Sequence, residues 1–460
     1  MAEKQEKIKI KDINEITVLN AITHGSRCTK FTVLISGFGS LLHGQIIKGL
    51  IFLAYQALTW IVFISFGWQY IQDLSTLGTR NMTSQMQEAF GNTVRVNVLG
   101  DNSLQILLYS VFAVAVLAFG VIIHFGAVRS SYAADIDIRR GRRPTGFAQD
   151  IRNIFDRNIH TGMLTLPSIG AIAFTVVPII FMVLLAFTNF DRTHQPPGNL
   201  FTWVGLENFR NVFDMGGFMG STFFRILGWT LIWAVFATFL NYIFGMVVAL
   251  MINKSGIRLK SVWRTCFVIA IAVPAFVTLL FMRQALGEMG PINTILQSMG
   301  LNVVHFLEDP LTARITVIIV NLWIGIPYTM LITSGVLMNI PADLYEASRI
   351  DGAGAVRQFR SITLPYMFAV TAPYLITQFI GNINNFNAIF FLTAGGPATV
   401  DYYNAGKTDL LVTWLYSLTV SHGDYNLASV IGILTFIVSA IIALITFNIT
   451  SSSKKEETFR

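Results

Sequence analysis

The sequence predicts an all-α polytopic membrane protein with about eight transmembrane helices. Its 460 residues are 53% hydrophobic and only 12% charged, and they include 37 Phe. A soluble globular core cannot bury that much apolar surface. Apolar windows of about 20 residues, the length that crosses ~30 Å of hydrocarbon, recur along the chain. They lie near residues 49–68, 104–126, 164–188, 226–252, 263–286, 313–337, 366–392 and 427–448.

The charges between these windows predict the orientation of the spans. Most of the 32 Lys and Arg residues lie in the N-terminal tail, in every second connection and in the C-terminal tail. Because Lys and Arg accumulate on cytoplasmic loops, we expect both termini in the cytoplasm. The N-terminal tail shows no small-residue cleavage pattern, so we expect it to stay attached. The net charge of +7 is thus explained by topology, and no nucleic-acid partner is expected.

Four regions follow from this pattern. Residues 1–30 form a cytoplasmic tail, and residues 31–163 hold two N-terminal spans with a basic cytoplasmic loop, ADIDIRRGRRPTGF. The run FTVLISGFGSLL before the first span is too short to cross a bilayer and is expected to be interfacial or re-entrant. Residues 164–450 form a core of six spans, and residues 451–460 form a second cytoplasmic tail.

The connection between the sixth and seventh spans, residues 339–365, is charged but keeps helical spacing. Pro341 suits the first turn of a helix, where a missing N–H costs little, and Asp343 complements the helix dipole there. Gly352 and Gly354 allow the positive φ angles of a tight reversal, and Pro365 marks the turn into the seventh span. These residues predict a short helix-turn-helix, which from spacing alone could simply lie on the membrane surface.

Two spans each carry a polar stripe at helical spacing. An unsatisfied carboxamide in hydrocarbon costs roughly 2–7 kcal/mol, so the stripes must face the bundle interior, a cavity or each other. Interhelical hydrogen bonding is one interpretation. A cavity for a neutral, hydroxyl-rich ligand such as a sugar is the other, and it is favoured by the nearby aromatic residues Tyr328, Trp323, Phe379 and Phe386. The stripes are Asn321, Gly325 and Tyr328 in the sixth span and Gln378, Asn382 and Asn385 in the seventh.

The sequence indicates no energy source or metal within this chain. The glycines Gly39 and Gly44 have the spacing of a phosphate-binding loop but lack its lysine, so the chain is not expected to bind ATP. No metal site is expected, because the histidines are scattered. Ion-driven carriers usually place charged residues at mid-membrane, whereas here Arg283 and Glu288 lie only at the end of the fifth span.

Residues of the 339–365 connection resemble the EAA loop of ABC importer membrane subunits. The matching pattern is Glu346-Ala347-Ser348, Gly352, Ile362 and Leu364-Pro365, with Ser in place of the second Ala. The resemblance implies that the chain is not an enzyme and carries no cofactor, and that separate ATPase subunits bind ATP and Mg²⁺. The residues that would contact an ATPase are Glu346, Ala347, Ser348, Asp351, Gly352 and Ala353.

Longer runs resemble the larger permease subunit of maltose and maltodextrin ABC importers. They are IIVNLWIGIPY, DLYEAS, DGAG, NNFN, LTAGGP and AGKTDLLVTWLY. The resemblance implies a type I importer core preceded by two extra helices. This sequence differs from the family at Gly381, where the family has an aromatic residue, and at Gln378, where it has a smaller hydroxyl residue. The identity and length of the sugar are therefore left open. The expected sugar-site residues are Asn321, Ile324, Gly325, Tyr328, Gln378, Asn382 and Asn385.

The same resemblance implies a set of partners in a bacterial cell membrane. They are a second homologous permease, two ATPase subunits and an extracellular binding protein that delivers an oligosaccharide. Maltose or maltodextrin is the first expectation, and a galacto-oligosaccharide or raffinose-type sugar is the alternative within the same class. A stand-alone secondary sugar carrier is the alternative from another class. The binding protein is expected to meet the connection after the third span and the loop 393–407.

Overall fold

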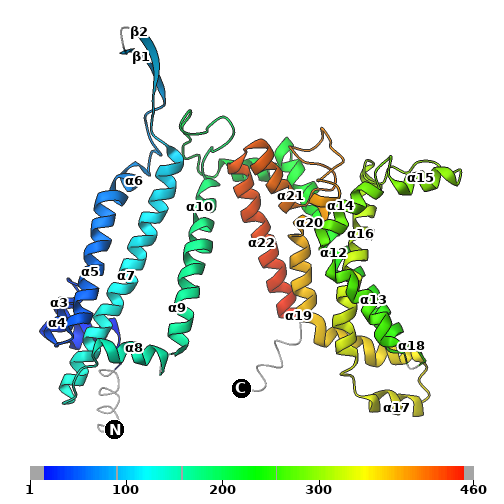
Figure 1. The fold of residues 1–460 in the computed structure, drawn as a ribbon, viewed down its shortest axis with the longest axis horizontal. Coiled ribbons are helices and arrows are strands. Elements are labelled where there is room, and N and C mark those ends of the chain that lie inside the picture. The colour runs from blue at the N-terminus through cyan, green and yellow to red at the C-terminus, as the bar shows by residue number, and fades with distance from the viewer. Residues whose placement is uncertain (1–14, 90–91, 157–158, 255, 450–460) are drawn as a thin grey trace. The chain divides into compact units, whose positions relative to one another are not determined.

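The computed structural model describes residues 15–89, 92–156, 159–254 and 256–449 (Figure 1). The described residues are mainly helical, with one two-stranded sheet, which confirms the all-α polytopic membrane class. Within these ranges, six helical stretches are long and apolar enough to cross a membrane, and one bent helix pair could be a seventh. The chain divides into two compact units, Met1–Trp203 and Val204–Arg460. The first unit therefore also holds the third predicted span.

The first unit contains three long helical stretches and several short helices. Its first stretch is α5, the π-helical turn η1 and α6, its second is α7, and its third is α9, η2 and α10. The run predicted not to span includes the end of α3 and α4, which are both too short to cross a bilayer. The elements are α2 (Val18–His24), α3 (Arg27–Thr32), α4 (Phe38–Leu42), α5 (Ile46–Val62), η1 (Phe63–Gly67), α6 (Trp68–Asp73), β1 (Thr83–Ala89), β2 (Asn92–Val98), α7 (Ser103–Arg139), α8 (Phe147–Phe155), α9 (Ile159–Ala171), η2 (Ile172–Val176) and α10 (Val177–Leu185).

Buried polar groups hold the short N-terminal helices against α7. The Asp135 carboxylate, only 4% exposed, accepts hydrogen bonds from the backbone N–H of Ser26 at 2.7 Å and from Arg139 Nη2 at 3.0 Å. A buried carboxylate needs such donors to offset its lost hydration. Farther along the chain, Lys48 forms an ion pair with Asp150 at 2.6 Å. The first contact holds the start of α3 on α7, and the ion pair joins α5 to α8.

A β-hairpin that the sequence did not predict follows α6. Strands β1 and β2 pair antiparallel, from Thr83 opposite Val98 to Ala89 opposite Asn92. At its base Asp101 accepts hydrogen bonds from the backbone N–H groups of Thr79 and Arg80. These two N–H groups lower the pKa of Asp101 from its ordinary value. The hairpin lies in a polar segment, where period-two hydrophobic alternation is weak.

The second unit is a helix bundle built around α12 and α16. Its elements are α11 (Glu207–Phe213), α12 (Phe218–Asn253), α13 (Lys260–Ala272), α14 (Ala275–Ala285), α15 (Pro291–Ser298), α16 (Pro310–Leu337), α17 (Ala342–Ile350), α18 (Ala355–Gln358), η3 (Phe359–Thr363), α19 (Leu364–Ile383), α20 (Phe386–Leu392), α21 (Leu411–Tyr416), η4 (Ser417–His422) and α22 (Tyr425–Ile449). Helices α12 and α16 approach closely, because a Cβ on Gly245 would lie 2.7 Å from Cβ of Thr329.

Two of the predicted spans are broken rather than continuous helices. The fifth consists of α13 and α14, which meet at 86°. Pro274 lacks an N–H and pushes Val273 into an extended conformation, with φ −81° and ψ 123°. The seventh is α19 followed by α20, and it is not among the helices long and apolar enough to cross a membrane. Its break lies at Asn384 and Asn385.

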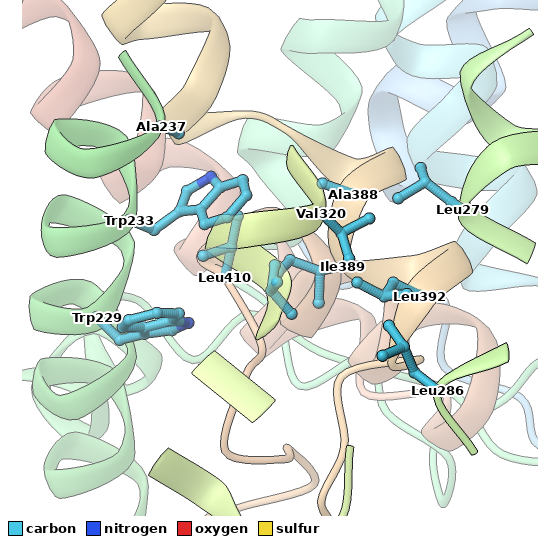
Figure 2. Packing of buried hydrophobic residues seen from close by; sticks show 11 residues of the cluster. Trp229, Trp233, Ala237, Leu279, Leu286, Val320, Ala388, Ile389, Leu392 and Leu410 are labelled. Carbon is cyan, nitrogen blue, oxygen red and sulfur yellow. The ribbon is translucent and has the colours of Figure 1, made fainter. Parts of the chain in front are cut away.

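An apolar cluster packs the end of the bundle that lies away from α17. Trp229, Trp233 and Ala237 of α12 belong to one cluster with residues of α14, α16 and α20, which Figure 2 shows. Trp233 is fully buried, and its Nε1 donates to the backbone oxygen of Asn382 at 3.1 Å. Ala237 of this cluster also lines the polar cavity described below, so the cluster adjoins that cavity.

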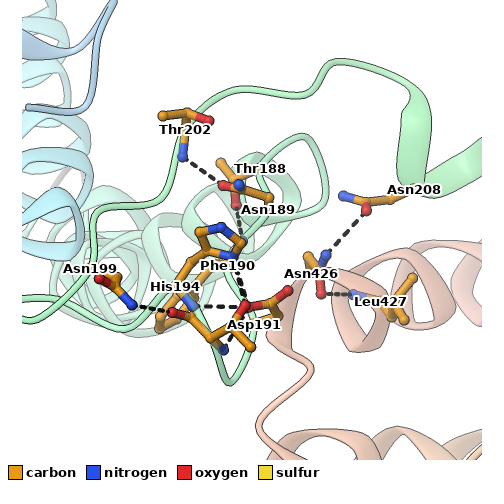
Figure 3. Close-up of polar contacts among 11 residues, drawn as sticks. Thr188, Asn189, Phe190, Asp191, His194, Asn199, Thr202, Asn208, Asn426 and Leu427 are labelled. Carbon is orange, nitrogen blue, oxygen red and sulfur yellow. Dashed lines mark hydrogen bonds and ion pairs between the residues drawn. The ribbon is translucent and has the colours of Figure 1, made fainter.

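Each unit also contains short polar segments with their own hydrogen bonds, which Figure 3 shows. In the first unit, Asn189 Oδ1 accepts from the backbone N–H of Thr202 at 2.6 Å, and Asp191 accepts from the N–H of His194 at 2.9 Å. The connection after the third span is therefore folded by its own hydrogen bonds. In the second unit, Asn426 Nδ2 donates to Asn208 Oδ1 at 3.1 Å, which joins α22 to α11.

Candidate functional site

A cavity of about 340 Å³ lies within the second unit. Its volume is within the range of small-molecule sites. The structure brings all seven expected sugar-site residues to this one cavity. It is lined by Ala237, Thr238 and Asn241 of α12, by Ala270, Ile271, Val273, Pro274 and Ala275 at the α13–α14 bend, by Asn321, Ile324, Gly325, Tyr328 and Thr329 of α16, and by Tyr374, Leu375, Gln378, Asn382 and Asn385.

The break between α19 and α20 places the two asparagine amides in the cavity wall. Asn385 is not part of a continuous helical stripe, because its side chain instead caps α20 by accepting from the backbone N–H of Ala388 at 3.2 Å. Its Nδ2 faces Asn382 Oδ1 at 3.4 Å, and Asn382 Nδ2 donates to Thr238 Oγ1 at 2.9 Å. Asn384 donates to the backbone oxygen of Ile380 and does not line the cavity. Interhelical bonding and a cavity lining thus both occur at the same residues.

The α16 stripe lines the opposite wall. Gly325 lies flat against the amide of Asn241, so that a Cβ on Gly325 would come within 2.5 Å of Asn241 Oδ1. Tyr328 is 51% exposed and can turn its ring and hydroxyl toward a ligand. Trp323, by contrast, is 65% exposed and lines an apolar pocket with α13 instead.

Of the four aromatic residues expected near the stripes, only Tyr328 lines the cavity; Trp323, Phe379 and Phe386 do not. Phe386 packs instead against Phe390 and Tyr416. The break after Ile383 changes the direction of the helix, which explains why spacing alone misplaced this ring. A second tyrosine, Tyr374, lines the cavity from α19.

Four polar lining residues were missed by the sequence reasoning: Thr238, Asn241, Thr329 and Tyr374. Asn241 lies in the middle of an apolar helix, and the rule that a mid-membrane amide needs a partner would have selected it. Tyr374 lies four residues before Gln378, on the same helix face. No lining residue carries a charge, so the cavity offers hydrogen bonds and ring faces only.

The predicted helix-turn-helix is present at the end of the second unit. The chain reverses after α17 at Gly352, which has a φ of +76°. Glycine adopts this left-handed conformation readily because it has no Cβ. Gln358 Nε2 donates to Ser348 Oγ at 2.8 Å, and the hydroxyls of Tyr345 and Thr363 are 2.8 Å apart. Pro341 precedes the first helical residue rather than lying in the first turn. The motif is thus held together by its own side chains.

The predicted coupling residues lie on the free surface of this motif. Glu346, Ala347, Asp351 and Gly352 are exposed, whereas Ser348 and Ala353 are partly buried. Within the described part of the chain, Glu346 has no hydrogen-bond or ion-pair partner. Apolar side chains that the sequence reasoning did not select are also exposed there: Ile350 is 88% exposed and Val356 is 73% exposed. Exposed apolar residues with an unpaired carboxylate are typical of a protein–protein contact.

At the opposite end of the bundle, the loop 393–409 closes on itself and is fixed to two helices. The backbone N–H of Thr408 donates to Gly395 O at 3.1 Å, and Trp229 Nε1 donates to Thr408 O at 3.1 Å. Arg314 Nε donates to Lys407 O at 2.9 Å. Asp409 lies inside the loop and accepts from the backbone N–H of Gly406 at 2.8 Å. The loop is therefore a preformed surface rather than a flexible connection.

The Asp409 carboxyl predicts a measurable pH dependence. Burial raises the pKa of Asp409 to about 6, against the opposing hydrogen bonds from Gly406 and Thr413. A carboxyl whose pKa is higher in the folded state stabilises the fold below its unfolded pKa, and this stabilisation is lost as pH rises through the folded pKa. We therefore expect the thermal midpoint of the purified protein to decrease as the pH rises from about 4 to about 6.5, because of a free-energy change of at most about 3 kcal/mol.

Asp409→Asn should flatten that pH profile, since the amide oxygen can still accept from Gly406. The variant should be more heat-stable than the wild type at pH 7.5 and similar to it at pH 4.5. Asp401→Asn is the matched control, because Asp401 is exposed in the same loop. An unchanged profile in Asp409→Asn would mean that Asp409 is not the titrating group.

Among the described residues, one cluster brings together three side chains of the kinds that bind metal ions. Glu288, His305 and Glu308 place their ligand atoms within 4.8 Å of one another, and all three are exposed. His305 Nδ1 lies 2.6 Å from a Glu288 carboxylate oxygen, so the groups are already paired with each other. The sequence predicts no metal site, and this exposed cluster does not change that expectation.

These features define a class: a polytopic membrane protein with an uncharged polar cavity in its helix bundle and an exposed helix-turn-helix at one end. Residues 241–453 match the family model described as "Binding-protein-dependent transport system inner membrane component". The galactooligosaccharides transport system permease protein GanP of Bacillus subtilis (strain 168) is 35% identical over 92% of this chain and 97% of its own length. The chain therefore belongs to the family of inner membrane components of binding-protein-dependent transport systems.

Other relatives place the chain among sugar permeases. The maltodextrin transport system permease protein MalC of Streptococcus pneumoniae is 33% identical over 90% of this chain and 93% of its own length. The maltose/maltodextrin transport system permease protein MalF of Klebsiella aerogenes is 37% identical over 55% of this chain and 50% of its own length. These names confirm the resemblance to maltose and maltodextrin permeases that the sequence motifs indicate.

A solved structure shares the fold. A chain of a bacterial ABC transporter involved in the import of the acidic polysaccharide alginate is 22% identical, covers 65% of this chain and 98% of its own length, and has a TM-score of 0.53. At that identity the likeness shows the fold alone. It agrees with the ABC importer type of core expected for residues 164–450.

Proposed function

We propose that this chain is a permease subunit of an ATP-driven ABC importer that moves an oligosaccharide across the membrane. The observation that carries the proposal is the cavity of the second unit. Asparagine and glutamine amides and tyrosine hydroxyls line it, and no charged residue does. Amides can match both the donors and the acceptors of sugar hydroxyls, and tyrosine rings can lie against the apolar faces of a sugar.

The energy is proposed to come from separate subunits. Two ATPase subunits would bind ATP and Mg²⁺, and this chain would contact one of them through Glu346, Ala347, Ser348, Asp351, Gly352 and Ala353. The exposed carboxylate of Glu346 supports this contact, because it has no partner among the described residues and can form a charge-assisted hydrogen bond with a basic group. The chain itself would act as a transporter subunit without catalysis.

The remaining partners follow the relatives' names and the geometry. A second, homologous permease would complete the pathway, and an extracellular binding protein would deliver the sugar at the end of the bundle that carries the loop 393–409. The fixed conformation of that loop, held by Trp229 and Arg314, supports its use as a docking surface. Both termini would then lie in the cytoplasm, as the charge pattern of the connections predicts.

The sugar is proposed to be a maltodextrin or a galacto-oligosaccharide, the two classes that the relatives' names print. Gln378 and Gly381 are the positions where the chain departs from the maltose pattern. Gly381 lies in open space, because a Cβ added there would have no neighbouring atom within 4 Å. It is exposed and does not line the cavity, so of the two positions only Gln378 changes the lining.

The test is sugar-stimulated ATP hydrolysis by the complete complex with its binding protein. Maltotriose, maltotetraose, galactotriose and raffinose should be compared at equal concentrations. We expect one class to raise the ATPase rate at least several-fold and to be taken up into proteoliposomes. If none of these sugars changes the rate or enters, the oligosaccharide proposal is wrong.

A stand-alone secondary carrier is the rival function. Liposomes that hold this chain alone should show no sugar flux under a proton or sodium gradient, because the cavity contains no titratable carboxylate to couple with an ion. Gradient-driven flux in such liposomes would contradict the importer proposal and support the carrier.

A further inference from the structure

Two polar atoms in the cavity wall have no hydrogen-bond partner in the part of the chain that the structure describes. They are Oδ1 of Asn241 and the hydroxyl oxygen of Tyr374, and both are shielded from solvent. A buried polar group without a partner costs about 1–3 kcal/mol. Asn241 is 8% exposed, and its Nδ2 already donates to the backbone oxygen of Ala237 at 2.7 Å. Only the acceptor end of this amide is therefore free.

The two atoms come from facing helices at one level of the cavity. Helices α12 and α19 run antiparallel, as two hydrogen-bonded pairs show. Asn382 Nδ2 donates to Thr238 Oγ1 at 2.9 Å, and the hydroxyls of Tyr242 and Thr371 are 2.7 Å apart. Asn241 follows Thr238, and Tyr374 precedes Asn382, so both lie between these two pairs.

This level differs from that of Asn382 and Asn385, although it lies beside Gly325 of α16. Tyr374 and Asn382 are eight residues apart on α19, which corresponds to about 12 Å along the helix. The Tyr242–Thr371 pair lies farther along both helices toward α17, and Tyr242 is fully buried. The cavity thus has one polar end at Asn321, Asn382 and Asn385 and a second polar end at Asn241 and Tyr374.

We propose that Asn241 and Tyr374 form a second hydroxyl-binding subsite at the α17 end of the cavity, which takes a further ring of the transported oligosaccharide. The inference rests on the proposed function, and it names residues that set sugar length. A ligand hydroxyl would donate to Asn241 Oδ1, and a neighbouring hydroxyl oxygen would accept from the Tyr374 O–H. Adjacent hydroxyls on a pyranose ring offer this combination of donor and acceptor.

Such a subsite also explains why two polar atoms without a hydrogen-bond partner are retained in the cavity wall. If Asn241 served only to pack α12 against α16, an apolar residue of similar shape would serve better, because replacing an unpaired polar atom is neutral or stabilising. The contact of Asn241 with Gly325 would place such a subsite directly beside an expected sugar-site residue. The unpaired amide oxygen of Asn241 thus lowers the stability of the fold at the position where a ligand would bind.

The test uses the complete complex with its binding protein in proteoliposomes, and it measures sugar molecules imported per ATP hydrolysed. The probes are maltose, maltotriose and galactotriose. Tyr374→Phe and Asn241→Leu should each lower this ratio about fivefold for the trisaccharides, as expected for one lost hydrogen bond, and less for maltose. The thermal midpoint of Asn241→Leu should equal or exceed that of the wild type.

Tyr242→Phe is the matched control, because it removes a tyrosine hydroxyl that is already paired with Thr371 and does not line the cavity. It should leave the import ratio near the wild-type value. Unchanged ratios in Tyr374→Phe and Asn241→Leu, with a lowered ratio in Asn382→Ala, would overturn the subsite but leave the proposed function intact. An unchanged ratio in Asn382→Ala as well would overturn both.

Discussion

Glu346→Lys should abolish sugar uptake while the chain still reaches the membrane. Glu346 is exposed on α17 and has no partner among the described residues, so charge reversal there leaves the internal contacts of the chain intact. If a basic group of an ATPase meets this carboxylate, the reversal replaces attraction by repulsion. Breaking such a desolvated charge pair costs 2–5 kcal/mol, which corresponds to a loss of roughly 30-fold to a few thousand-fold in assembly or coupling.

The measurement is sugar uptake by cells that express the variant, together with co-purification of the ATPase subunits. Asp156→Lys is the control, since Asp156 is an exposed carboxylate outside the 339–365 motif. It should leave both uptake and co-purification unchanged. Normal uptake in Glu346→Lys would contradict the assignment of this motif as the ATPase contact.

The motif around Glu346 shows why one part of the fold could be predicted from sequence. Its signals are local: Gly352 has the positive φ expected at a reversal, and Asp343 lies in the first turn of α17. Such signals depend on neighbouring residues in the chain only. The exposure of Ile350 and Val356 could not be predicted in the same way, because their apolar character alone favours burial.

The cavity could be predicted only in part, for a related reason. Mid-membrane amides such as Asn321 and Asn382 require polar surroundings wherever they lie, so they were found from sequence. The break that directs Asn385 into the cavity depends on its capping of α20, and the contribution of Pro274 depends on the 86° bend at the α13–α14 junction. Hydropathy windows average over such breaks and therefore predict straight spans.

The tyrosines illustrate the limit of helical spacing. Tyr328 lies in the stripe that spacing selects, whereas Tyr374 was missed although it is on the same face of α19 as Gln378. A tyrosine in a membrane helix is common at the interface, so its type gives little information. Only the facing position of Asn241 on α12 makes Tyr374 a candidate contact.

Gly325→Val should eliminate most sugar transport while leaving the helix bundle assembled. A Cβ at this position would lie 2.5 Å from Oδ1 and 2.6 Å from Nδ2 of Asn241. The side chain of Asn241 or the two helices must therefore move, and overpacking of this kind costs typically 1–3 kcal/mol. The added methyl groups would also occupy the cavity between the two polar ends. We expect import to fall at least about tenfold, since both binding and volume are affected.

A Gly→Val change at a second position of α16 separates the effect on the cavity from the effect on helix propensity. A Cβ at Gly335 would have no neighbouring atom within 4 Å, so Gly335→Val changes the intrinsic helix preference of α16 equally but leaves the cavity unchanged. Its import and ATPase rates should stay near those of the wild type. If Gly335→Val lost as much import as Gly325→Val, the defect would come from α16 itself. A selective loss in Gly325→Val would instead show that the close approach of α12 and α16 is what gives the cavity its shape.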